Sequence, residues 1–96
     1  MLSQEDIIQK LQSIKPELEE KYFVKKIGIF GSYASNNYSE NSDIDILVEF
    51  KKPIGWIYLS LEIYLEKIFN KKIDLVTKNA IKKQISNNIL EEVKFI

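Results

Sequence analysis

Residues 43–50, DIDILVEF, alternate between apolar and mostly acidic side chains, which is the pattern of a half-buried β-strand. Because successive strand side chains point to opposite faces, one face is apolar and the other carries Asp43 and Asp45. The apolar face consists of Ile44, Ile46, Val48 and Phe50. Such a face needs a cover, so the chain is predicted to build a sheet with helices packed against it.

The rest of the chain supplies the other elements of such a fold. Strands are predicted over residues 25–30 and 73–77, helices over residues 3–20, 56–69 and 78–93, and a loop with room for a helical turn over residues 31–42. Ser3 and Asp6 predict a capping box on the first helix. The order predicts an α/β (α+β) fold, a small mixed β-sheet flanked by helices. No repeat or linker interrupts residues 1–96, so we expect a single domain.

The composition excludes several kinds of chemistry. The chain has no Cys, which removes disulfides and thiolate metal sites, and no His, which removes zinc-hydrolase centres and Ser-His or Cys-His nucleophiles. All fourteen basic residues are Lys, and fourteen acids balance them, so sequence-specific DNA binding is not expected. No long apolar run or basic leader is present, which predicts a cytoplasmic protein without a membrane span.

Acidic residues occur where strand packing favours apolar ones. Asp43 and Asp45 share a strand face, about 7 Å or less apart, where two like charges repel unless a cation lies between them. Mg²⁺ or Mn²⁺ fits such hard oxygen ligands, although a solvent-exposed strand end would also accommodate the pair. Asp74 lies within the apolar strand over residues 73–77, where we interpret it as a carboxylate in the core.

Gly31 and Ser32 follow the first strand directly. Glycine allows the backbone to approach a ligand closely, and serine adds a hydroxyl and an N–H for a phosphate oxygen. The alternative is an ordinary exit from a strand into a turn. Taken alone, the Gly-Ser pair supports both interpretations equally. Together with the three aspartates, it favours a ligand-binding site.

The spacing Gly31-Ser32, ten residues, Asp43-x-Asp45 and a later Asp74 resembles the nucleotidyltransferase superfamily of DNA polymerase β and kanamycin nucleotidyltransferase. The segments GSYASNNYSENSDIDILVEF, KKIDLVT and ISNNILEEVKFI are more closely similar to the minimal nucleotidyltransferases (the MNT family), which include the antitoxins of HEPN/MNT toxin–antitoxin systems. The resemblance covers nearly the whole chain. It implies a polymerase β-like palm fold and a HEPN-domain toxin as partner.

The resemblance also implies roles for these residues. Asp43 and Asp45 would hold two Mg²⁺ ions (or Mn²⁺), and Asp74 would ligate the catalytic ion or accept the proton of the nucleophile. Gly31 and Ser32 would hold the β- and γ-phosphates of a nucleoside triphosphate, most simply ATP. An acceptor hydroxyl would take the AMP, and in some members of this family the acceptor is a tyrosine of the HEPN toxin. The alternative is an inactive antitoxin that neutralises the toxin by binding alone.

Three local features complete the prediction. Family members commonly carry Arg-Gly where this chain has Ser35 and Asn36, so a bidentate arginine clamp on phosphate is missing. Trp56, Leu59 and Ile63 lie on the polar side of their predicted helix, where they are covered by the chain itself or form a surface for a partner or a homodimer. For the loop residues Tyr33 and Tyr38, we expect packing within the protein and not stacking on a nucleobase.

Overall fold

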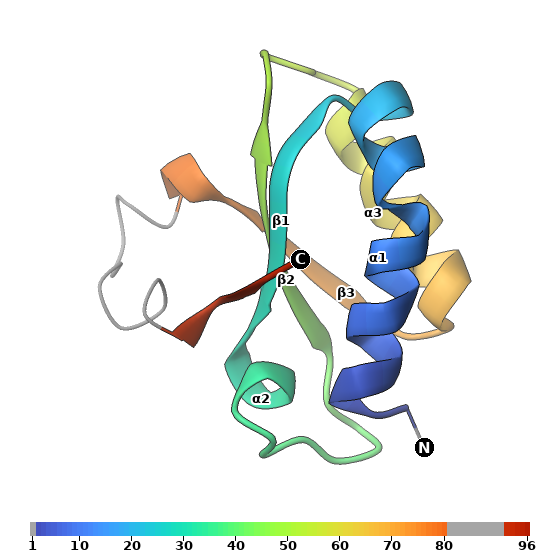
Figure 1. Cartoon of the computed structure of the whole chain (residues 1–96), viewed down its shortest axis with the longest axis vertical. Coiled ribbons are helices and arrows are strands. Elements are labelled where there is room, and N and C mark those ends of the chain that lie inside the picture. The colour runs from blue at the N-terminus through green and yellow to red at the C-terminus, as the bar shows by residue number, and fades with distance from the viewer. Residues whose placement is uncertain (1, 81–91) are drawn as a thin grey trace.

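Four strands form one sheet in the order β3-β2-β1-β4, and the structure, a computed structural model, describes residues 2–80 and 92–96. Figure 1 shows the two long helices, α1 and α3, on one face of this sheet and the short helix α2 at one end of it. The elements are α1 (Gln4–Lys21), β1 (Val24–Phe30), α2 (Gly31–Ala34), β2 (Ile44–Phe50), α3 (Ile57–Phe69), β3 (Ile73–Thr77) and β4 (Lys94–Phe95).

The sheet is mixed, as predicted. β1 pairs antiparallel with β2 and with β4, whereas β2 and β3 run parallel. A parallel pair needs a crossover connection, and α3 supplies it between β2 and β3. The sequence did not indicate β4. The helix predicted over residues 78–93 falls largely on residues 81–91, which lie outside the described residues.

The first helix begins as its sequence predicts. The Ser3 side chain accepts a hydrogen bond from the Asp6 N–H at 3.0 Å, and the Asp6 carboxylate accepts one from the Ser3 N–H at 3.0 Å. This reciprocal capping box satisfies two N–H groups that a helix start leaves unpaired. The helix then continues past Pro16 to Lys21, so the proline does not end it.

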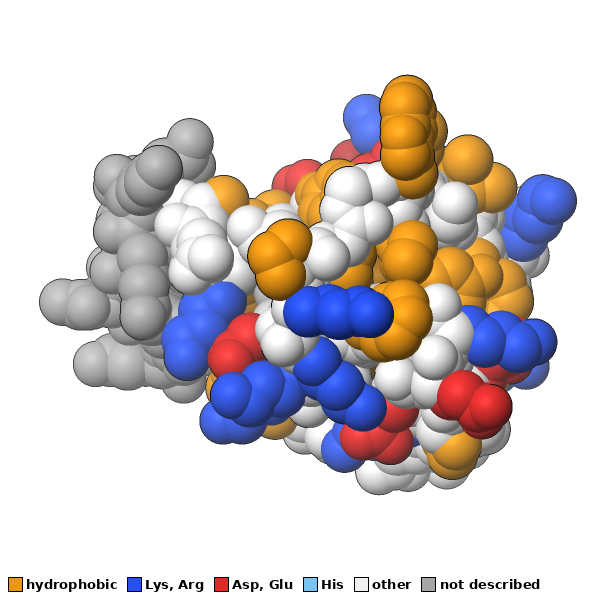
Figure 2. Space-filling view, turned by 90° about the horizontal axis from the view of Figure 1, so that it is seen from above, with side chains coloured by type: hydrophobic (Ala, Val, Ile, Leu, Met, Phe, Trp, Pro, Cys, Tyr) orange, Lys and Arg blue, Asp and Glu red, His pale blue; other side chains and the backbone are white. Residues whose placement is uncertain are grey.

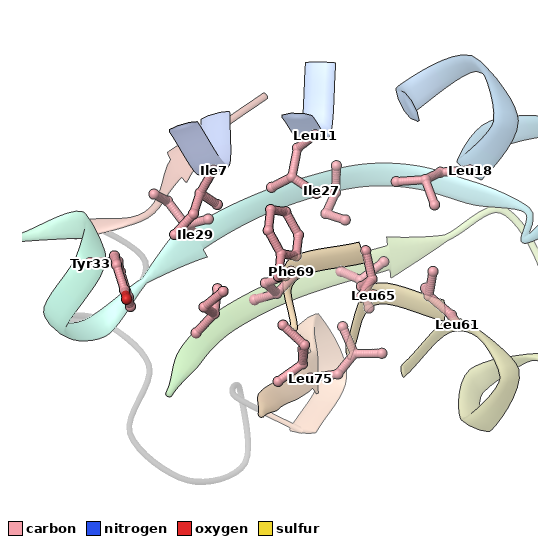
Figure 3. Close-up of a cluster of buried hydrophobic side chains, with 14 of the residues drawn as sticks. Ile7, Leu11, Leu18, Ile27, Ile29, Tyr33, Leu61, Leu65, Phe69 and Leu75 are labelled. Carbon is pink, nitrogen blue, oxygen red and sulfur yellow. The ribbon is translucent and has the colours of Figure 1, made fainter. Parts of the chain in front are cut away.

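The core lies between the sheet and the two long helices. Figure 3 shows side chains from both helices and from three strands meeting there, with Tyr33 of α2 at one end of the cluster. The fully buried members include Ile7, Leu11 and Leu18 of α1, Ile27 and Ile29 of β1, Ile44, Ile46 and Val48 of β2, and Leu61 and Leu65 of α3. The helix and strand periodicities therefore identified the core faces correctly.

The outward face of α3 is apolar at three positions. Trp56, which caps the helix, is 86% exposed, and Leu59 and Ile63 are about half exposed. The prediction that these side chains point away from the core is confirmed. In the described part of the chain, no helix has the length and apolar character needed to cross a membrane.

Candidate active site

Two aspartates lie side by side at one end of the sheet. The parallel register of β2 and β3 pairs Asp45 directly with Asp74, and the antiparallel register of β1 and β2 pairs Asp45 with Phe30, the last residue before α2. All three strand positions are at the same end of the sheet. The register thus brings together residues that are almost thirty positions apart in the chain.

The interpretation of Asp74 as a core carboxylate was wrong. Ile73 and Leu75 are buried against the helices, whereas Asp74 is exposed on the opposite face of the sheet, because side chains alternate along the strand. Asp74 lies on the same face of the sheet as Asp45, and the Asp45 side chain is half-buried. Asp43 precedes β2 and is exposed. Asp43 and Asp74 are therefore exposed and Asp45 is partly so, with Asp45 and Asp74 on the face of the sheet opposite to α1 and α3.

The pKa of Asp45 is raised to about 6. The largest cause is burial, followed by repulsion from the Asp74 carboxylate and hydrogen bonding to it; the charge of Asp43 adds a smaller effect in the same direction. Asp45 is therefore affected by the charges of both other aspartates. A cation at this position would relieve the repulsion.

Within the described ranges, no ion pair compensates these acids. Among the described residues, the ion pairs join Lys21 to Glu17 and both Lys25 and Lys78 to Glu49, and none includes Asp43, Asp45 or Asp74. At Glu49, burial works to raise the pKa, but hydrogen bonds from Lys78 and Lys25 outweigh it and lower the pKa. Glu49 is thus neutralised by two lysines, as is typical of a carboxylate with a structural role, whereas no ion pair in the described ranges includes Asp45.

The donor set fits a hard divalent cation. Its members are carboxylate oxygens, the ligands that Mg²⁺ and Mn²⁺ prefer, and a bound cation would offset the burial and the repulsion that raise the pKa of Asp45. Within residues 2–80 and 92–96, however, no three His, Cys, Asp or Glu side chains already stand in a metal-binding arrangement. Asp45 and Asp74 are nevertheless adjacent on neighbouring strands, which is where a ligand set would start.

Gly31 lies against the Asp45 carboxylate. Its φ is +69°, and a Cβ built on it would overlap Oδ2 of Asp45. No other residue type could bring its backbone this close to the carboxylate in this conformation. The two candidate features of the sequence, the Gly-Ser pair and the aspartates, are therefore one site.

The short helix α2 carries the backbone groups that a phosphate could use. It begins at Gly31, no side chain caps its N-terminus, and Ser32 is half-buried on its first turn. Tyr33 and Ala34 bury the other side of the helix in the core. Tyr33 also stacks on Tyr38, with ring centroids 4.3 Å apart, so packing is its role and a fully buried ring cannot receive a nucleobase.

The loop after α2 contains Ser35 and Asn36, the two positions where the sequence resemblance leads to an expected Arg-Gly pair. Asn36 has φ +63°, in the left-handed region that glycine favours and asparagine tolerates, so a glycine would also fit the backbone at this position. Ser35 is exposed and offers no charge in place of the missing arginine. Lys71 Nζ donates a hydrogen bond to the Glu40 carbonyl at 2.7 Å, which ties this loop to the start of β3.

The structure also contains a cavity away from these carboxylates. It measures about 480 Å³ and is lined by residues 48–50, 52–54 and 77–79, at the opposite end of β2 and β3 from Asp45 and Asp74. Figure 2 looks onto this end of the molecule and shows lysine side chains beside hydrophobic ones. The cavity does not contain the carboxylates, so it is not the candidate active site.

One residue that contacts α2, the short helix beside Asp45, was not predicted from the sequence. Gln4, in the first turn of α1, donates hydrogen bonds to the carbonyl oxygens of Tyr33 and Ala34. Nothing in the sequence marks Gln4, since a glutamine in a first helical turn is common and its partners are about thirty residues away. Only the tertiary structure reveals the contact.

Comparison with known proteins identifies relatives over the whole length of the chain. The family model described as a nucleotidyltransferase domain matches residues 11–96. The protein adenylyltransferase MntA of Thermococcus cleftensis is 40% identical over 97 residues, covering 100% of this chain and 98% of that protein. A protein of Methanocaldococcus jannaschii, named as a candidate protein adenylyltransferase, is 47% identical over 88 residues, covering 91% of this chain and 90% of its own.

Solved structures share the fold at lower identity. A candidate minimal nucleotidyltransferase superposes with a TM-score of 0.81 at 21% identity, covering 97% of this chain and 95% of that one. A toxin–antitoxin complex with AMP-PNP superposes with a TM-score of 0.68 at 24% identity, covering 98% of this chain and 72% of that one. The complex of an MNT antitoxin with the tri-AMPylated HEPN toxin of Shewanella oneidensis superposes with a TM-score of 0.63 at 20% identity. The match covers 91% of this chain and 69% of that one. At these identities the likeness establishes the fold.

Proposed function

Because this chain belongs to the nucleotidyltransferase domain family and is a minimal nucleotidyltransferase, we propose that it transfers AMP from ATP to a tyrosine hydroxyl of a HEPN-domain toxin and thereby acts as an antitoxin. The observation that carries the proposal is the position of Asp45, which lies against the Gly31 backbone and is close to Asp74 and Asp43. None of the three aspartates has an ion pair among the described residues. We place the reaction in the cytoplasm, where ATP is available, and within a single domain of 96 residues.

The aspartates are the residues that would hold Mg²⁺. Asp45 and Asp74 already lie side by side, and the exposed Asp43, two residues before Asp45, would complete the ligand set. Two such ions, when bound, supply Lewis-acid charge at the attacking and leaving oxygens of a phosphoryl-type transfer. Mn²⁺ has the same ligand preference and is expected to substitute.

The chain's own groups account for binding and proton movement. The backbone N–H groups of Gly31 and Ser32, with the Ser32 hydroxyl, would bind the β- and γ-phosphates at the start of α2. Asp74, which is exposed beside Asp45, would accept the proton of the acceptor hydroxyl. The acceptor oxygen then bonds to the α-phosphorus, the bond from the α-phosphorus to the bridging oxygen breaks, and pyrophosphate leaves.

Intact-mass spectrometry tests the proposal directly. The protein, ATP and Mg²⁺ are incubated with the HEPN-domain protein from the same organism, and the mass of that partner is measured. We expect one or more additions of an adenylyl group, with none when Asp43→Asn replaces the wild-type protein. A partner of unchanged mass would contradict AMP transfer to it.

A second candidate function is neutralisation of the toxin by binding alone. The observation that favours it is the absence of arginine, since Ser35 leaves the phosphates without a bidentate clamp. A stable complex that suppresses toxin activity without ATP and without any mass change would support this function in place of transfer.

Introducing the missing arginine is expected to strengthen transfer. In Ser35→Arg, a guanidinium at the exposed loop position adds charge-assisted hydrogen bonds to phosphate, which predicts a gain of about fivefold or more in the transfer rate at limiting ATP. The measurement is the rate of partner adenylylation at several ATP concentrations. Ser39→Arg, in the same exposed loop, is the control for added charge. Equal gains in both variants would show that position 35 has no special contact.

A further inference from the structure

The short helix α2 depends on tertiary contacts for its position. It has four residues, far fewer than an isolated helix needs, and its first residue must remain against Asp45 for the Gly31 and Ser32 backbone to face the carboxylates. The burial of Tyr33 and Ala34 fixes one side of the helix. The helix also ends in carbonyl groups that need partners.

Gln4 supplies partners for these carbonyl groups. Its Nε2 donates to the Tyr33 carbonyl at 2.7 Å and to the Ala34 carbonyl at 3.0 Å. Its Oε1 accepts a hydrogen bond from Lys94 Nζ of β4 at 3.2 Å. With two carbonyl acceptors on one side and an ammonium donor on the other, a single orientation of the amide satisfies all three contacts.

One side chain therefore joins three elements that the sequence separates widely. Gln4 is half-buried in the first turn of α1, a turn that the capping box of Ser3 and Asp6 holds in place. Through this amide, α1 and β4 fix the end of α2 opposite to Gly31. A small rotation of α2 would move the Gly31 and Ser32 backbone away from a bound phosphate.

We propose that Gln4 is a positioning residue for nucleotide transfer, which sets the orientation of α2 through the Tyr33 and Ala34 carbonyls. The inference rests on the proposed function, because it assumes that α2 binds the phosphates of a nucleoside triphosphate. Gln4 itself has no contact with the aspartates. It acts through the backbone of α2.

The test is binding of AMP-PNP with Mg²⁺, measured by calorimetry on the full chain at a temperature where circular dichroism shows each variant to be folded. Gln4→Met retains the length of the side chain without its hydrogen bonds, and we expect about fivefold weaker binding. Gln4→Glu retains the shape but turns a carboxylate oxygen toward two carbonyls, and we expect a loss of tenfold or more. Gln9→Met is the matched control, since Gln9 lies on the same helix and bonds only the exposed Glu5.

The outcomes separate the inference from the function on which it rests. If the wild-type chain does not bind AMP-PNP, the phosphate site itself is wrong. If wild-type protein binds and the folded Gln4 variants bind equally well, Gln4 has only a structural role and the positioning inference fails. Weaker binding in both Gln4 variants, with Gln9→Met unchanged, supports it, and a greater loss in Gln4→Glu identifies the carbonyl contacts as the cause.

Discussion

Asp45→Asn is expected to abolish AMP transfer and, in the absence of divalent cations, to make the protein more stable. The variant removes a proposed metal ligand, so a loss of about a thousandfold or more in the transfer rate is expected, as for the removal of a principal electrostatic contribution to catalysis. It also removes a charge that is half-buried beside Asp74 and close to Asp43. The gain in stability is about 1 kcal/mol, reduced from the full pKa effect because the carboxylate is partly solvated.

The protonation of Asp45 determines at which pH the stability gain of Asp45→Asn is expected. The pKa of Asp45 is about 6 in the folded protein and 3.8 for an unperturbed carboxyl, so the folded state binds more protons between these values and wild-type stability falls as the pH rises through this window. The advantage of Asp45→Asn should therefore be complete above about pH 6 and disappear below about pH 4. Thermal melts in EDTA across this range measure it, with a shift of about 5 °C expected at pH 7.

Two controls make the stability measurement specific. Glu20→Gln removes an exposed acid at the far end of α1 and should leave the melting temperature unchanged at every pH. Adding Mg²⁺ should raise the melting temperature of the wild-type protein and leave that of Asp45→Asn almost unchanged, because a ligand stabilises only the protein that binds it. A variant that melts below wild type in EDTA at pH 7 would contradict the assignment of an unfavourable carboxylate cluster.

Gly31→Ala is expected to remove transfer and to destabilise the fold. The new Cβ would overlap Oδ2 of Asp45, and alanine at φ +69° adds strain of about 1 kcal/mol. Relief of the overlap requires either α2 or the Asp45 side chain to move, and both belong to the site. We expect a loss of a hundredfold or more in transfer rate, consistent with misplacement of reacting groups by about 1 Å, and a loss of stability of about 2 kcal/mol or more.

Gly55→Ala separates backbone strain from the overlap. Gly55 also has a positive φ, +51°, but a Cβ built on it meets no atom within 4 Å. This variant should lose about 1 kcal/mol of stability and retain full transfer activity. Denaturant unfolding and the partner-mass assay, run on both variants, measure the two effects. If Gly31→Ala retained wild-type transfer, the close approach of Gly31 and Asp45 would have no role in catalysis.

The sequence predicted those features that depend on residues close together in the chain. Strand alternation placed Ile44, Ile46 and Val48 in the core, helical spacing did the same for the inner face of α3, and Ser3 with Asp6 marked the start of α1. These features follow from the periodicity of a helix or strand and from local hydrogen bonding. The spacing of the Gly-Ser pair and the aspartates likewise indicated the family, which the family model confirms.

The tertiary structure alone decided how distant segments meet. The register of β2 with β3 put Asp45 beside Asp74 and turned Asp74 toward solvent, where the sequence had suggested burial. Gly31 packs against Asp45, Gln4 holds the end of α2, and β4 completes the sheet edge through contacts that span from about 14 to 90 positions. Local propensity carries no information about such contacts, because strand register and crossover path are set by the packing of the whole core.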